Sequence, residues 1–441
     1  MTTLKTALNQ KRGNDFFAIS NGLDFDKRIF DEEIQVQRAW LQELNKIQIV
    51  TAKEFKKIDS ALKKAQTLHT KGVFPWSIAD EDIHMNIESF LTKTCGSCAK
   101  KIHIGRSRND LIATTLRLYM KNQIHEMNEK LSALAGAALD RAEAFSTHLI
   151  PAFTHMQSAQ PIRMGQTFLA YAYWVQRDIA RLSAVAENTM QYMPLGSGAI
   201  NGTHLPVDLQ RLAKNLDFKN PSYCSYDAVG DRDFLQEFTG AIAIFASHLS
   251  RICNDVIFLS STPVSALILP QEWSSGSSIM PNKRNPDLFE IVRAKSARMM
   301  AASSEINTVF QALPSGYSSD LHETKRIIAR TLDELNYCLE PMTDALAKME
   351  VNAERLDQIL NQGNILATDI ANAEVAAGKT FRDSYRHTAI LVKKAQADGR
   401  QVHELSGQHS FARSVESRNN IGGNSLRQLQ NSIKQLRKHS S

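Results

Sequence analysis

Apolar residues recur along much of the chain at alternating spacings of three and four positions. The longest run consists of Phe238, Ile242, Phe245, Leu249, Ile252, Val256 and Leu259. The same spacing occurs in residues 120–138 and, with gaps, in residues 288–313, and residues 168–186 form a fourth segment of this kind. A period near 3.5 residues is typical of long helices that pack side by side at small crossing angles. The pattern therefore predicts an all-α fold with an elongated central helical bundle.

Glycine- and proline-containing segments separate the periodic stretches. The breaks at 194–198, 274–278 and 314–316 mark loops, the last of which ends the preceding helix. We expect three domains, namely a helical N-terminal domain (1–107), a central helical bundle (108–349) and a small helical C-terminal domain (350–441). A long bundle exposes an apolar side that association would bury, so the bundle is expected to be the oligomerisation core.

The composition is that of an ordinary soluble globular protein, since 43% of the 441 residues are hydrophobic and 22% are charged. The formal net charge of +6 is not gathered into a basic run, which makes nucleic-acid binding a poor explanation. The apolar stretch around residues 241–246 is too short to span a bilayer, and the N-terminus lacks the apolar core of a signal peptide. We therefore expect a cytoplasmic protein that binds neither nucleic acid nor membranes.

Five cysteines without a secretory signal argue against a disulfide framework. Cys95 and Cys98 form a single CxxC pair. Zinc would need two more ligands, and the sequence has no second CxxC or spaced histidine pair to supply them. An incidental loop sequence is the favoured interpretation, with a redox or metal role as the alternative, and no metal site is expected.

Two polar segments contain residues suited to anion binding or to proton transfer. Ser107, Arg108 and Asn109 offer hydrogen-bond donors beside the start of a predicted helix, which is where anions bind readily. The simpler explanation is a helix cap with solvated arginines. His155, in residues 154–161, is of a residue type that can act as a general acid or base near neutral pH, although a lone histidine is more often structural.

A third segment, the signature loop of residues 274–286, is harder to explain as a flexible linker. Lys283 and Asn285 are suited to stabilising a developing oxyanion, and Ser277 becomes a strong base where nearby charge and dipoles stabilise its alkoxide. The loop runs into a predicted helix that carries Glu290. A fourth segment, residues 227–233, is explained mainly by charged helix caps.

The signature loop also carries a family resemblance. Its sequence GSSIMPNKRNPD resembles the GSSxMPxKxNP signature of the fumarase/aspartase superfamily. The order and spacing of other segments resemble the argininosuccinate lyase family within it, namely DEDIHMNIE (80–88), HIGRSRND (103–110), THMQSAQP (154–161), PLGSGAINGT (194–203) and YDAVGDRDF (226–234). Residues 367–385 and 421–426 extend the resemblance nearly to the C-terminus.

The resemblance implies an anti β-elimination that releases fumarate from a succinyl-amine, with no metal or organic cofactor. It implies that Ser277 removes the Cβ proton, while Lys283 and Asn285 stabilise the resulting aci-carboxylate. It further implies that His155 gives a proton to the leaving nitrogen and that Glu290 orients this histidine. The family also implies a homotetramer in which three subunits share each active site.

Further residues occupy positions that hold the substrate in the family. They are Ser107, Arg108, Asn109, Thr154, Asp82, His84, Tyr317, His322 and Lys325. Asp82 could form a charge-assisted bond with a guanidinium, because a guanidinium needs acceptors.

The chain departs from the family pattern at several positions. Ile104 replaces a threonine, Ser158 an arginine, Gly230 a serine and His322 a glutamine, and the segment at Gly22 lacks a serine. These departures affect mainly the part of the site that meets the amine, whereas the succinyl end is well matched.

Three alternatives remain open. A lyase of the same superfamily could act on another succinyl-amine, such as adenylosuccinate or an aminopolycarboxylate, and the Lys283-Arg-Asn285 tripeptide resembles adenylosuccinate lyase. A structural relative, as the lens crystallins are, and a helical scaffold would not need Ser277, His155 and Glu290. Release of fumarate, which absorbs ultraviolet light, distinguishes an enzyme from a scaffold.

Overall fold

The computed structural model describes residues 22–80, 82–407 and 409–440. The first 21 residues of the expected N-terminal domain and Glu81 of the 80–88 motif lie outside these ranges. The chain divides into two compact units. The first contains the described residues up to Met127, with Arg181–Ile242 and Ala301–Asp333, and the second contains Asn128–Ala180, Ala243–Met300 and the described residues from Glu334 onward. The three expected domains remain a prediction.

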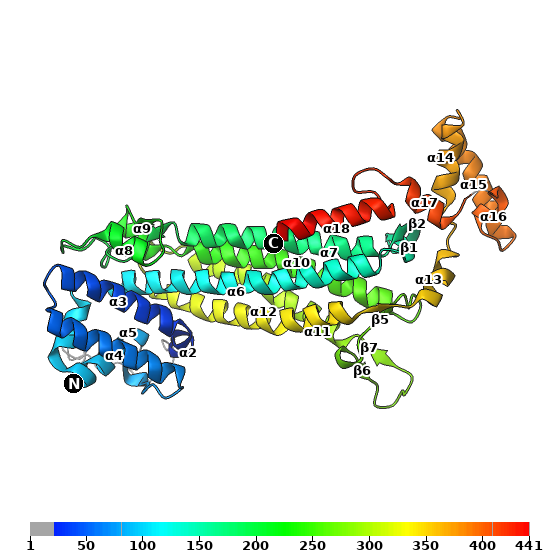
Figure 1. Ribbon diagram of the computed structural model, residues 1–441. Helices are drawn as coiled ribbons and strands as arrows, with labels where there is room; N and C mark the ends of the chain where they lie inside the picture. The colour runs from blue at the N-terminus through cyan, green and yellow to red at the C-terminus, as the bar shows by residue number, and fades with distance from the viewer. Residues whose placement is uncertain (1–21, 81, 408, 441) are drawn as a thin grey trace. The chain divides into compact units, whose positions relative to one another are not determined.

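Five long helices, which Figure 1 labels, have residues in both units. They are α6 (Arg108–Ala144), α7 (Gly165–Thr189), α10 (Asp233–Ser260), α11 (Asp287–Phe310) and α12 (Glu323–Lys348). Polar contacts join neighbouring helices within each unit. In the first unit Gln236 of α10 donates to Asn307 of α11 at 2.6 Å. In the second unit Lys130 of α6 donates to Asn336 of α12 at 2.9 Å. The predicted all-α fold with a central helical bundle is therefore confirmed.

The first unit adds short helices and one small sheet. Its helices are α2 (Leu23–Asp26), η2 (Lys27–Ile29), α3 (Phe30–Lys46), α4 (Ala52–Thr70), η3 (Ile78–Asp80), α5 (Ile83–Cys95), η4 (Gly96–His103), α8 (Leu209–Asn215), α9 (Ser225–Gly230) and η6 (Ser319–His322). Its strands β3 (Tyr192–Met193) and β4 (Asn220–Pro221) pair in parallel. Thr51 starts α4 with a capping box, because its side chain accepts from the Glu54 N–H while Glu54 accepts from the Thr51 N–H.

The second unit adds three antiparallel strand pairs and a helical C-terminal region. The pairs are β1 (Leu149–Thr154) with β2 (Gln157–Arg163), β5 (Leu267–Ile268) with β8 (Glu350–Val351), and β6 (Ser275–Gly276) with β7 (Arg284–Asn285). Its helices are η5 (Gln271–Trp273), α13 (Ala353–Leu360), α14 (Ala367–Ala376), α15 (Phe381–Ala397), α16 (Val402–Ser406), α17 (Phe411–Ser417) and α18 (Leu426–Ser440). Ile370, Ala395 and Val402 form a small core among α14, α15 and α16.

Burial explains the apolar stripe of α10, whose residues Phe238, Ile242 and Phe245 are fully buried. Among the described residues α10 is the one helix long and apolar enough to cross a membrane by length and composition, with a mean hydropathy of 1.4 over 18 residues. This corrects the expectation that its apolar stretch is too short. A core helix has the same composition, since its apolar face is buried against other helices.

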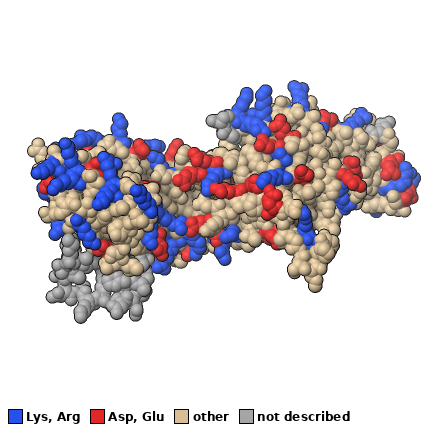
Figure 2. Space-filling model, turned by 60° about the horizontal axis from the view of Figure 1, so that its bottom comes forward, with Lys and Arg blue, Asp and Glu red and all other residues tan. Residues whose placement is uncertain are grey.

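The ends of elements differ from the sequence-based prediction at two places. α11 ends at Phe310, so Leu313 lies beyond the helix although it continues the apolar spacing. The β1–β2 pair was not predicted from the helical periodicity. The distribution of charge agrees with the absence of a basic run in the sequence. Acidic and basic residues are interspersed on the face shown in Figure 2.

Candidate functional site

The turn that precedes α6 lies in the first unit, and α6 begins at Arg108. The Ser107 N–H donates to Asp110, and the Asn109 N–H donates to the Ser107 hydroxyl at 3.2 Å. These two backbone donors are therefore already engaged. An anion at this turn would be met mainly by the side chains. Gly105 has φ 79°, and a Cβ there would approach a Leu205 methyl to 2.2 Å, so the turn requires glycine.

Asp110 joins two of the predicted motifs. One carboxylate oxygen accepts from the Ser107 N–H at 2.9 Å. The other accepts from the Gly196 and Gly198 N–H groups at 3.0 and 2.9 Å. Burial raises the pKa of Asp110 to about 6 despite these three donors. The fully buried carboxylate therefore fastens the turn before α6 to the loop that contains residues 194–198.

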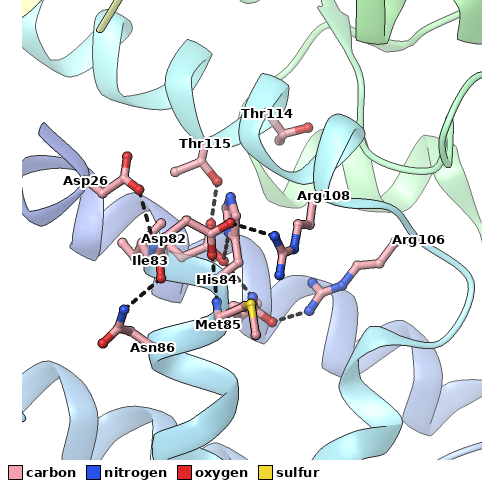
Figure 3. A network of polar contacts seen from close by, with 12 residues as sticks. Asp26, Asp82, Ile83, His84, Met85, Asn86, Arg106, Arg108, Thr114 and Thr115 are labelled. Atoms are coloured by element: carbon pink, nitrogen blue, oxygen red, sulfur yellow. Dashed lines mark hydrogen bonds and ion pairs between the residues drawn. The ribbon is translucent and has the colours of Figure 1, made fainter. Parts of the chain in front are cut away.

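Asp82 and His84, both predicted to bind substrate, lie at the start of α5 (Figure 3). One Asp82 oxygen accepts from the Met85 N–H at 2.9 Å, and the other pairs with the Arg108 guanidinium at 3.0 Å. Asp82 is therefore not a free acceptor for a substrate guanidinium in this structure. His84 is buried, and its Nδ1 forms an ion pair with Glu33 of α3 at 2.9 Å.

The residues expected to meet the amine also contact protein partners in the first unit. The Tyr317 hydroxyl lies 2.6 Å from His322 Nε2, and burial raises the pKa of Tyr317. Lys325 Nζ forms an ion pair with Asp26 at 2.6 Å. The second Asp26 oxygen accepts from the Ile83 N–H at 3.2 Å. Asp26 thus links Lys325 to the start of α5, next to Asp82 and His84.

Asp26 and Glu33 were not identified from the sequence. Both are buried acids, 1% and 0% exposed. A pattern pointed to Glu33, because it occupies the apolar stripe of α3 between Phe30 and Leu41, where a charged residue is out of place unless it is paired. Its partner cannot be read from that pattern.

The signature loop lies in the second unit. Ser275 pairs with Asn285 in the β6–β7 ladder, and the Asn285 amide also donates to the Ser275 hydroxyl at 3.4 Å. The Ser275 N–H donates to Asp287 at 2.8 Å, which ties the loop to the first turn of α11. The loop therefore brings Ser277, Lys283 and Asn285 onto one short segment.

The Ser277 hydroxyl has two backbone donors directed at it. It accepts from the Met280 N–H at 3.1 Å and from the Ile279 N–H at 3.4 Å. Donors that point at an oxygen favour its ionised form. This arrangement satisfies part of the condition under which a serine can act as a base.

Thr154 and His155 lie where β1 turns into β2, also in the second unit. His155 and Met156 have φ values of 53° and 61°, which is uncommon for residues other than glycine and occurs often at functional sites. Among the described residues no hydrogen bond or ion pair joins His155 to the signature loop. The predicted residues thus form three groups, namely the first-unit cluster, the signature loop with Glu290, and the β1–β2 turn.

The cysteine pair has ordinary structural contacts. Cys95 donates to the Leu91 carbonyl and Cys98 to the Cys95 carbonyl, each at 3.1 Å. Burial, with Cys98 close by, raises the pKa of Cys95 to about 11. A thiol held in its neutral form is a poor nucleophile, which favours the incidental interpretation.

Comparison with known proteins identifies the family to which this chain is similar. A lyase family model matches residues 11–301. The chain is 36% identical to an argininosuccinate lyase of Geobacter sulfurreducens over 87% of this chain and 84% of that protein. It is 35% identical to an argininosuccinate lyase of Hydrogenovibrio crunogenus over 94% and 93% of the two chains. A third argininosuccinate lyase, of Dehalococcoides mccartyi, is 37% identical over 88% and 84%.

Solved structures share the fold. EDDS lyase in complex with formate superposes with a TM-score of 0.84 at 24% identity, covering 94% of this chain and 87% of that one. A class II fumarase from Schistosoma mansoni superposes with a TM-score of 0.72 at 19% identity, covering 87% of each chain. The identities of 35–37% to the three lyases above show that the chain belongs to the argininosuccinate lyase family.

Proposed function

We propose that this protein cleaves argininosuccinate to arginine and fumarate by a reversible β-elimination that serves arginine biosynthesis. The supporting observation is its similarity to argininosuccinate lyases along as much as 94% of the chain. The reaction breaks a carbon–nitrogen bond. It requires a base for the Cβ proton, a site for the charge that develops on the adjacent carboxylate, and an acid for the leaving nitrogen.

Ser277 is the proposed base. Its hydroxyl accepts from the Met280 and Ile279 N–H groups, and these donors would lower the free energy of the alkoxide. Removal of the Cβ proton leaves two negative charges on one carboxyl group, the aci-carboxylate. Lys283 and Asn285 stabilise this dianion electrostatically. Collapse of the dianion expels the nitrogen and forms the double bond of fumarate.

His155 is the proposed acid, which protonates the leaving nitrogen, and Glu290 orients it. Thr154 and the turn of Ser107, Arg108 and Asn109 hold the substrate carboxylates. His84 supports the binding of these carboxylates, and Asp82, Tyr317, His322 and Lys325 hold the remainder of the substrate. No metal or organic cofactor is needed for these steps.

A homotetramer with active sites shared among three subunits is the proposed assembly. Within the described residues of the second unit, no hydrogen bond or ion pair joins His155 to the signature loop. The signature loop also exposes Ile279, which is 82% accessible. A neighbouring subunit that covered this loop would bury Ile279 and bring the groups together. We propose a cytoplasmic location, with neither nucleic acid nor membrane as a partner.

The test is release of fumarate, followed by ultraviolet absorbance, from argininosuccinate, adenylosuccinate and an aminopolycarboxylate succinyl-amine in parallel. We expect turnover of argininosuccinate alone. Turnover of another succinyl-amine without argininosuccinate would move the function within the superfamily. Absence of fumarate from all three would contradict a catalytic role.

A further inference from the structure

One face of α3 supports the turn that begins α6. Glu33, Gln37 and Trp40 follow one another at spacings of four and three, so they lie on the same side of the helix, and all three are buried. The Trp40 indole donates to the Ile104 carbonyl at 3.0 Å. The Gln37 side chain accepts from Arg106. This face of α3 thus fastens the segment immediately before Ser107.

Glu33 lies at the centre of these contacts. Gln37 donates to one of its oxygens at 2.6 Å, and the Thr115 hydroxyl of α6 donates to the other at 2.8 Å. His84 completes the set with the 2.9 Å ion pair. A carboxylate that is fully buried loses its hydration, so it is tolerated only when donors and an opposite charge replace the water.

The ion pair with Glu33 determines the direction in which the pKa of His84 is shifted. Burial alone would lower the pKa of His84, but Glu33 raises it above its usual value. The pairing likewise outweighs burial at Glu33, whose pKa is lowered. Both shifts favour the charged pair, so His84 carries a positive charge over a wider pH range than a solvated histidine.

His84 is in turn connected to the turn before α6. Asp82 caps α5 two residues before His84 and pairs with Arg108. His84, Arg106 and Arg108 line one small cavity. The other titratable groups that face His84 or line this cavity are Asp26, Asp82, Glu88, His103, Arg106 and Arg108. His103 is neutral near pH 7, because burial and the nearby cations lower its pKa to about 4.

We propose that Glu33 is a positioning residue, which acts through His84 to hold the turn of Ser107, Arg108 and Asn109 in place for an anionic group of the substrate. The inference rests on the proposed function, which supplies a succinyl group with two carboxylates. The charge on His84 adds to the favourable field at this turn. Glu33 itself does not touch the substrate.

The pH dependence follows from the ion pair. The contribution that a histidine with a raised pKa makes to binding is present at low pH and is lost as the pH rises through that pKa. Binding of the succinyl group should therefore weaken as His84 loses its proton. Replacement of Glu33 by glutamine removes the largest contribution that raises the pKa of His84 and leaves Asp82 and Asp26 to oppose burial, which moves the loss to lower pH.

The pKa of His84 can be measured without activity. Exchange of the imidazole C2 proton for deuterium, followed by mass spectrometry across pH, reports each histidine separately when each lies in its own peptide. Trypsin cleavage after Lys71 and Lys93 gives a peptide in which His84 is the single histidine. We expect a wild-type pKa above about 6.5, the unperturbed value. A wild-type pKa at or below that value would overturn the proposal whether or not any variant folds.

The second measurement compares Glu33→Gln with the matched control Glu32→Gln. Glu32 is the preceding residue on α3, is 8% exposed, and accepts from Asn122 at 2.7 Å instead of contacting His84. For Glu33→Gln we expect a lower His84 pKa and a rise of KM for argininosuccinate, about tenfold near neutral pH, with a smaller change in kcat. Glu32→Gln should leave the dependence of KM on pH unchanged. Glu33→Asp should give a dependence closer to wild type than that of Glu33→Gln.

The outcomes separate the two proposals. An active wild type whose Glu33→Gln variant is less thermostable but keeps the wild-type KM profile and His84 pKa would make Glu33 merely structural, and would overturn this inference alone. A shift of similar size in Glu32→Gln would also overturn it. A wild type that releases no fumarate would overturn the proposed function and the role assigned to Glu33 with it.

Discussion

The buried ion pair of Asp26 and Lys325 gives a prediction whose size can be worked from its geometry. The two charges lie 2.6 Å apart, and their side chains are 1% and 10% exposed. At an effective dielectric constant of about 20, their attraction is about 6 kcal/mol. Loss of hydration offsets part of this, and removal of one partner of a buried pair costs about 3–5 kcal/mol. Lys325→Met should therefore destabilise the protein by that amount, because Asp26 stays buried without a cation.

The double variant Asp26→Asn/Lys325→Met should regain most of the stability. It buries no charge, and the asparagine oxygen can still accept from the Ile83 N–H. An unfolding entropy of about 2.1 cal/mol/K per residue makes 3–5 kcal/mol equal to roughly 3–5 °C in the thermal midpoint for a chain of this length. The assay is the midpoint of wild type, both single variants and the double variant under identical conditions. We expect the double variant to recover at least half of the loss seen in either single variant.

Kinetics then separates stability from binding. Lys325 is also a proposed substrate-binding residue, so the double variant should remain impaired for argininosuccinate although it is stable. Equal losses that simply add in the double variant would show that the two charges are not coupled. A Lys325→Met midpoint identical to wild type would refute the reasoning from burial.

Three further predictions concern Ser277, His322 and Asp110. Ser277→Ala should lower kcat by about 100-fold or more with the thermal midpoint preserved, because the lost hydroxyl is the base and lies on a loop; retention of a tenth of the activity would exclude that role. KM for argininosuccinate should rise below about pH 6.5, because protonated His322 would repel a guanidinium. His322→Gln should flatten this rise. Identical KM profiles for wild type and His322→Gln would remove His322 from the site. Burial raises the pKa of Asp110 from 3.8 to about 6, so the folded state binds this proton more tightly and the group's contribution to stability falls by about 3 kcal/mol as the pH rises through that range. About half of this loss occurs below pH 5, so the midpoint of wild type relative to Asp110→Asn should fall between pH 5 and 7.5 by an amount that corresponds to about 1.5 kcal/mol. A constant difference would contradict the shift.

Local periodicity made the long helices predictable, because a buried stripe repeats within a single segment. Residues 238–259 lie inside α10 and residues 168–186 inside α7. The same periodicity misplaced Leu313, which is apolar and correctly spaced but follows the end of α11. It also missed the β1–β2 turn. His155 and Met156 adopt positive φ values there, and the segment has no glycine that would indicate such a conformation. Backbone conformations imposed by tertiary contacts leave no periodic trace.

The candidate site was predictable where the chemistry is written in one segment. The signature loop holds Ser277, Lys283 and Asn285 within nine positions, so a motif can identify all three together. The partners that fix other residues come from distant segments. Asp26 reaches Lys325 across 299 positions, and such a pairing is a property of the fold. A buried acid within an apolar stripe indicates that a partner exists without identifying it.

The buried charges of the first unit are better explained by positioning than by stability. Well-packed apolar residues often stabilise a protein as much as a buried ion pair of the same volume, or more. A chain shaped for stability alone would therefore have little reason to bury Glu33 with His84 and Asp26 with Lys325. Both pairs end on residues proposed to hold the substrate, and both are anchored at the start of α5. Their placement points to a framework that fixes the orientation and charge of binding side chains before the substrate arrives, so that less of the binding free energy is lost in ordering them.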